Sequence, residues 1–221
     1  MTRLQRTRRL ACTLAATALA TAGLSGTAAH ATQAAPQFAA PEIGVQFNPD
    51  GDGGQCTGAT GQQWAPSPDW TPAIRIDTDN RPGGCQLAFG IHDSDHALDG
   101  ARISYTFLPS SDDASGQCGN YQGTYPMPIK RIRTFGQTVR IDADNRPGYC
   151  NLTFTVAGRD DVALDVQFYA DGDAGQCGSA DHPPLPQGQY QTAYDGNPVT
   201  ISIDTDGRGG GCQFMLRVRL F

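Results

Sequence analysis

The sequence contains one motif three times, and this internal repetition constrains the fold more than any other feature. Corresponding cysteines of the three copies are 59 to 65 residues apart. A fixed period of this length is typical of repeat architectures, in which one supersecondary unit recurs along the chain. The first cysteine of each copy follows Gly-Gln, and a second closes the motif; the pairs are Cys56 and Cys85, Cys118 and Cys150, and Cys177 and Cys212.

Each copy has three runs in which apolar residues alternate with polar ones, which predicts strands with one buried face. These runs begin at Ile43, Ile74 and Cys85 in the first copy, and corresponding runs occur in the other two. The linker before each second cysteine is rich in Asp, Asn, Arg, Pro and Gly, residues that favour turns. We therefore expect the second and third runs to form a hairpin, and residues 64–70 and 183–191 to form long loops.

Almost no segment has helical periodicity, so the sequence predicts an all-β fold of about three strands per copy. A unit of roughly 60 residues buries a small fraction of its surface on its own. We therefore expect the copies to pack as one pseudo-threefold body, with copy boundaries at 43–100, 101–161 and 162–221.

Six cysteines allow 15 pairings, but only two simple schemes treat the three copies alike. The bonds form either within each copy, or from the second cysteine of one copy to the first of the next. We favour pairing within each copy, which gives one disulfide per repeat. Each closed loop would then stabilise the fold by on the order of 3 to 4 kcal/mol in the chain-entropy model.

The N-terminal 31 residues have the features of a secretory signal peptide: four arginines, an apolar run over 10–24, and small residues before Ala31. The apolar run is too short to anchor the chain in a bilayer, so we expect a secreted, extracellular protein. Removing the four arginines changes the formal net charge from −6 to −10. Such an acidic chain is not expected to bind nucleic acid or anionic membranes.

No serine or cysteine stands in a recognisable nucleophile motif, so we expect a protein that is not an enzyme and has no cofactor. Two acidic loops have the alternating oxygen pattern that calcium favours, but the middle copy lacks it and no glutamate completes the loop. The expectation is therefore no metal site; the residues that calcium would use are Asp50, Asp52, Asp171 and Asp173.

Binding remains as the function, with two kinds of partner. One is a glycan, because threefold β folds often present a sugar site in each copy, built from an aromatic ring with Asp or Asn. The candidate aromatic residues of this lectin alternative are Trp64, Trp70, Tyr121, Tyr125, Tyr190 and Tyr194.

The other kind of partner is another secreted protein. Residues 32–42 form an Ala- and Pro-rich tail ahead of the first copy, and Phe38, Pro41 and Ile43 are its candidate anchors for a partner's groove. An exported repeat body with such a tail resembles, in layout only, the small adaptor subunits of actinobacterial umbrella toxin particles. The resemblance implies a non-catalytic protein-binding adaptor, which we place ahead of the lectin alternative.

Overall fold

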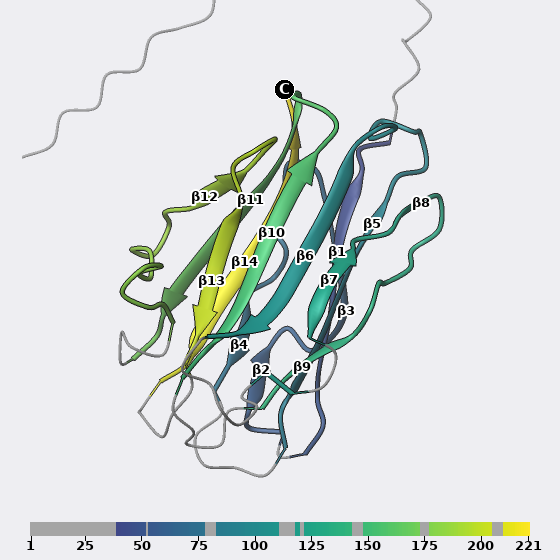
Figure 1. The fold of residues 1–221 in the computed structure, drawn as a ribbon. Helices are drawn as coiled ribbons and strands as arrows, with labels where there is room; N and C mark the ends of the chain where they lie inside the picture. The colour runs from purple at the N-terminus through teal and green to yellow at the C-terminus, as the bar shows by residue number, and fades with distance from the viewer. Residues whose placement is uncertain are drawn as a thin grey trace, which may run out of the picture. The chain divides into compact units, whose positions relative to one another are not determined.

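The first and third alternating runs of each copy form the central strands of three sheets. The computed structural model describes residues 39–51, 53–77, 83–110, 118–119, 122–142, 148–172, 177–204 and 210–221. Four candidate residues of the sequence analysis lie outside these ranges: Phe38, Asp52, Tyr121 and Asp173. Within the described ranges the protein is all-β, with three sheets and no helix (Figure 1).

Each sheet is built on one long antiparallel pair formed by the first and third runs of the same copy. In these pairs the alternate residues that face inward are buried, as the period of two predicts. The three pairs are β1 (Glu42–Pro49) with β5 (Cys85–His92), β6 (Arg102–Pro109) with β10 (Cys150–Ala157), and β11 (Val162–Ala170) with β14 (Cys212–Leu220).

The second run of each copy joins the sheet of a different copy. In Figure 1 the early, blue strand β4 belongs to the same sheet as the late, yellow strand β14. The three pairings are β4 (Ile74–Ile76) with β14, β9 (Val139–Ile141) with β5, and β13 (Val199–Ile203) with β10.

The predicted hairpin between the second and third runs is therefore wrong. A strand has two edges for backbone pairing, and both edges of each third run are occupied by other partners. For example, β5 lies between β1 and β9, and β14 lies between β11 and β4.

Short strands complete the edges of the sheets. One of them overlaps the loop expected at 64–70, because the backbone of Trp64 pairs with that of Gly44 on β1 despite the Gln- and Pro-rich sequence. These edge strands are β2 (Cys56–Gly58), β3 (Gly61–Pro66), β7 (Gly123–Pro126), β8 (Ile129–Lys130) and β12 (Gln191–Ala193).

Three disulfides join the two cysteines of each copy, which is the scheme favoured from the sequence. They link Cys56 to Cys85, Cys118 to Cys150, and Cys177 to Cys212. Because disulfides persist where the surroundings are oxidising, three of them indicate an extracellular type of environment. No helix in the described part of the chain is long and apolar enough to cross a membrane.

One hydrophobic core contains side chains from all three sheets. Phe89 of β5 makes edge-to-face contacts with Tyr105 and Phe154 of the neighbouring sheet, at ring-centroid distances of 5.0 and 5.3 Å. Residues 38–221 accordingly form one compact unit.

Candidate functional site

The outer face of the β12–β11–β14 sheet has a row of polar side chains in register. Asp165 of β11 lies opposite Thr192 of β12 on one side and Arg217 of β14 on the other. Arg219 stands two residues further along β14 and therefore on the same face. The strand pairing thus places one carboxylate between a hydroxyl and two guanidinium groups.

The Asp165 side chain is fully buried beneath these partners. Its Oδ2 lies 2.6 Å from Arg217 Nη2, and its Oδ1 lies 2.7 Å from Arg219 Nη2. Thr192 Oγ1 donates a further hydrogen bond of 2.8 Å to Oδ1. The hydrogen bond that Arg219 donates to Asp165 is the main cause that raises the pKa of the Arg219 guanidinium above its ordinary value. Two cations share one anion, which leaves one excess positive charge.

Aromatic rings enclose the two guanidinium groups. The Arg217 Cζ atom lies 4.3 Å from the centre of the Trp70 ring and 5.0 Å from that of Tyr190. The Arg219 Cζ atom lies 5.8 Å from the Tyr190 ring and 4.7 Å from the Phe221 ring. These are cation–π distances. We call Trp70, Tyr190, Arg217, Arg219 and Phe221 the aromatic–arginine cluster.

Thr71, the residue after Trp70, is hydrogen-bonded directly to β14. Thr71 N donates a hydrogen bond of 2.8 Å to Leu216 O, and Leu216 N donates one of 3.0 Å to Thr71 Oγ1. Tyr190 immediately precedes β12, which holds it beside Trp70 at a ring-centroid distance of 5.7 Å. The rings are nevertheless accessible, since Tyr190 is 45% exposed and Phe221 is 73% exposed.

The structure therefore brings together two of the aromatic residues that the sequence singled out, Trp70 and Tyr190. It places Trp64 elsewhere, on β3, where its ring lies over Gly44 and 4.9 Å from the Phe135 ring. Tyr125 lies on β7, 5.8 Å from the ring of the buried Tyr105.

Tyr194 is half exposed next to β12, and its backbone pairs with Asn197. It has an accessible ring, and its backbone hydrogen bonds lie within its own turn. The five described candidates thus do not recur at one corresponding place in the three sheets, as a sugar site in every copy would require.

The other members of the cluster were missed by the sequence analysis, although a signal for them was present. Arg217, Arg219 and Phe221 occupy the polar positions of the alternating run whose apolar positions include Leu216 and Val218. Alternate residues of a strand lie on the same face. The alternation that predicts the buried residues of this strand therefore also predicts that these three outward side chains are neighbours.

Two of the three tail anchors, Pro41 and Ile43, are not accessible in the folded body. Ile43 is fully buried in β1, between Ala65 and Ile91 of the adjoining strands, and Pro41 is also buried. Glu42 between them accepts two hydrogen bonds from Arg133, of 2.9 and 2.7 Å, which lower the pKa of its carboxyl. Residues 41–43 are therefore part of the body, and neither Pro41 nor Ile43 presents a free side chain to a partner.

The two described aspartates of the calcium pattern instead bind the protein's own groups. Asp171 accepts hydrogen bonds from Gly211 N at 2.6 Å and from Gln213 Nε2 at 2.7 Å, and it pairs with Arg75. Asp50 accepts one of 2.6 Å from Gly84 N and pairs with Arg140. Among the described residues, no group of three or more potential ligands surrounds a space for a metal ion.

These contacts set the acidity of both carboxyls. Partial burial acts to raise the pKa of Asp171, but the hydrogen bonds from Arg75 and Gln213 outweigh it, so the pKa is lowered from its ordinary 3.8. The same balance, with Arg140 as the cation, lowers the pKa of Asp50. Both side chains are therefore anchors between strands.

Comparisons with models of protein families, with curated proteins and with solved structures find no match to this chain.

Proposed function

We propose that this protein is a secreted, non-catalytic protein-binding adaptor and that the aromatic–arginine cluster is one of its contact surfaces. The observation that carries the proposal is the exposure of Tyr190 and Phe221 beside two fixed arginines. Trp, Tyr and Arg are the residue types that dominate hot spots in protein–protein interfaces. Holding the guanidinium groups in place before binding also reduces the entropy lost when a partner is bound.

A protein fits this surface better than a sugar does. A sugar site needs polar groups that are free to bind hydroxyls as well as an aromatic ring for the apolar face. Both oxygens of Asp165 already accept hydrogen bonds, from Arg217, Arg219 and Thr192. The aromatic rings therefore support the lectin alternative, but the carboxylate does not.

Export is supported by the N-terminal segment and by the disulfides. Residues 1–31 have the composition of a signal peptide, and three disulfides suit an oxidising compartment.

We also propose a pseudo-threefold architecture for the three copies. It is supported by the strand pairing, since the first and third runs of each copy share a sheet with the second run of another copy. The second run of the second copy joins the first copy, that of the third joins the second, and that of the first joins the third, through β4 and β14. This pattern of strand pairing is cyclic.

Residues 32–38 provide a second proposed contact of the adaptor. The segment proposed to dock in a partner is limited to these residues, since Pro41 and Ile43 belong to the body. Phe38 is then its remaining large apolar anchor. Membership of an extracellular toxin complex is part of this proposal, supported by the general layout alone.

The test is capture of partners from culture supernatant by the purified mature protein, followed by mass spectrometry. We expect a stoichiometric partner to bind the wild type and to be lost with Tyr190→Ala and Phe221→Ala. Ile132→Ala is the matched control, because Ile132 is 72% exposed and Phe221 is 73% exposed. Equal capture by all four proteins would contradict the role of the cluster.

A glycan array on the same proteins separates the two kinds of partner. Sugar binding that is lost in Tyr190→Ala would favour the lectin function over the adaptor function.

Deleting residues 32–38 tests the tail. The deletion should abolish binding of one partner, while the thermal unfolding of the protein stays the same.

A further inference from the structure

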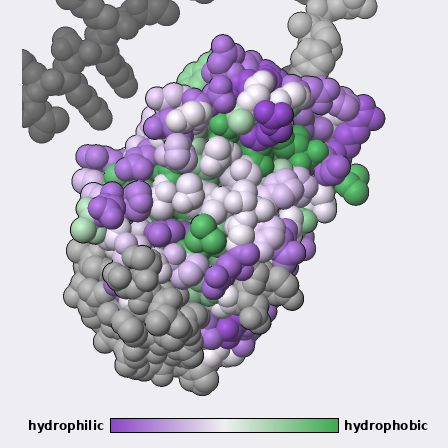
Figure 2. Space-filling model, in the orientation of Figure 1, coloured by the Kyte–Doolittle hydropathy of each residue, from purple (hydrophilic) through white to green (hydrophobic). Residues whose placement is uncertain are grey.

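A groove lies on a different face of the body from the aromatic–arginine cluster. Its volume is about 570 Å³, within the usual range of ligand sites. Residues of β6, β7, β8 and β10 line it, with the connection between β7 and β8 running along one side. Figure 2 shows a band of hydrophobic surface, in green, across the upper part of the visible face, where Figure 1 places β6 and β8.

The floor of the groove is aliphatic. Ile103 and Met127 are buried beneath it, and Ile129 and Pro128 are half-buried at its side. None of the 12 lining residues is aromatic. The half-buried Pro128 and Ile129 therefore offer dispersion contacts to an apolar side chain, and the lining has no aromatic face on which a sugar ring could stack.

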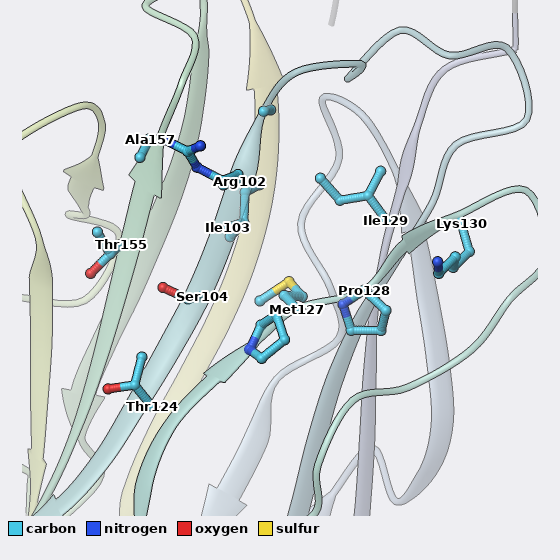
Figure 3. A pocket seen from close by; sticks show the side chains of 12 residues that line it. Arg102, Ile103, Ser104, Thr124, Met127, Pro128, Ile129, Lys130, Thr155 and Ala157 are labelled. Carbon is cyan, nitrogen blue, oxygen red and sulfur yellow. The ribbon is translucent and has the colours of Figure 1, made fainter.

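The rim of the groove is positively charged. Figure 3 shows Arg102 and Lys130 on opposite sides, with Met127 and Ile129 between them. Both cations are exposed, and within the described part of the chain neither forms an ion pair. No acidic residue lines the groove, and Lys130 is the only lysine of an otherwise acidic chain. An anionic group is the occupant that this charge distribution favours.

The wall of the groove supplies hydroxyl groups. Ser104 of β6, Thr124 of β7 and Thr155 of β10 all line it. A hydroxyl both donates and accepts hydrogen bonds, so it matches the N–H and C=O groups of a peptide backbone equally well.

We infer that this groove docks an acidic peptide segment of a partner protein, with an apolar side chain on the aliphatic floor and carboxylates at Arg102 and Lys130. The inference rests on the adaptor function proposed above and extends it. An adaptor needs at least two separate contact surfaces; the groove lies on a different sheet from the aromatic–arginine cluster and is a further contact beside that cluster and residues 32–38.

The experiment uses the purified mature protein and a fluorescent synthetic peptide, Asp-Glu-Leu-Leu-Glu-Asp, with fluorescence polarisation as the readout. We expect saturable binding that weakens with salt. The neutral peptide Asn-Gln-Leu-Leu-Gln-Asn should bind much more weakly. The double variant Arg102→Gln/Lys130→Gln should lose roughly 5- to 10-fold in affinity, as expected for two exposed charge pairs.

Two further variants separate the groove from general attraction between charges. Thr155→Trp fills the groove but keeps both cations, and it should also abolish binding. Arg131→Gln removes one exposed charge next to Lys130 but outside the lining, and it should leave the affinity unchanged.

Binding that survives Thr155→Trp, or that falls equally with Arg131→Gln, would overturn the inference. So would equal affinity for the neutral peptide, or binding of a glucuronic acid oligosaccharide in place of the peptide. Because this assay needs no natural partner, its failure is distinguishable from failure of the supernatant capture that tests the adaptor function.

Discussion

Arg75 Nε lies 2.5 Å from Asp171 Oδ2, although the two residues are 96 positions apart in the chain. The pair joins a strand of the first copy to the end of β11 in the third. Arg140 and Asp50 form the corresponding pair between the second and first copies. At the third such junction both positions are neutral, with Ser202 in place of the arginine and Ser110 in place of the aspartate.

The ion pair between Arg75 and Asp171 should contribute measurably to folding. We expect Arg75→Gln to lower the free energy of unfolding by about 1.5 to 3 kcal/mol, because it leaves partly buried carboxylates without their cation. Urea unfolding of Arg75→Gln, Asp171→Asn and the double variant gives the coupling between them. The control is Arg102→Gln, which removes an exposed arginine without an ion pair in the described part of the chain. Additive effects of the two substitutions would contradict a direct interaction.

Acid should weaken the fold through the same carboxylates. The pKa of Asp50 and that of Asp171 are lowered in the folded state from 3.8. A group with a lowered folded pKa contributes its full stability above its unfolded pKa and loses that contribution as the pH falls through the folded pKa.

We therefore expect the free energy of unfolding to decrease below about pH 4. Denaturant titrations between about pH 2 and pH 6 measure it. The double variant Arg75→Gln/Arg140→Gln should show a shallower decrease, since its carboxyls have pKa values closer to the ordinary one. A parallel decrease in both proteins would show that other groups cause the acid sensitivity.

Asp165 should be essential to the sheet that carries the aromatic–arginine cluster. Asp165→Asn keeps the shape of the side chain but leaves two guanidinium groups without their counterion. We expect it to destabilise the protein by about 3 kcal/mol, as when one partner of a buried ion pair is removed. Asp69→Asn is the control, because Asp69 is exposed. Thermal unfolding that is the same for both variants would refute this role of Asp165.

The disulfide of the third copy should stabilise the protein mainly by constraining the unfolded chain. Cys177 and Cys212 are 35 residues apart, and a loop of this length is expected to contribute about 3 to 4 kcal/mol. The variant Cys177→Ala/Cys212→Ala should therefore unfold at a clearly lower urea concentration, with the other two disulfides intact. An unchanged urea midpoint would mean that this disulfide does not raise the free energy of unfolding.

The sequence predicted which segments are strands better than it predicted their partners. Alternation marks a buried face, so the runs at Ile43, Ile103 and Leu164 could be assigned from local pattern alone. Pairing depends on which edges meet in space, and nothing local distinguishes a hairpin of β4 and β5 from the observed pairing of β4 with β14. For the same reason the partners of Asp50 and Asp171 could not be found, because Arg140 and Arg75 belong to other copies.

The candidate site was predictable in part. Trp70 and Tyr190 stand out as aromatic residues in polar surroundings, but their proximity depends on how residues 70 and 71 are fastened to β14. The groove had no sequence signal, since its floor and rim come from strands of different sheets.

The pairing of β4 with β14 has a consequence for how the molecule is made. The sheet that receives β4 also needs β11 and β14, which are the last long strands to leave the ribosome. β4 can pair early with β2, but its other edge lacks a partner until β14 has been synthesised, and such long-range closure slows folding.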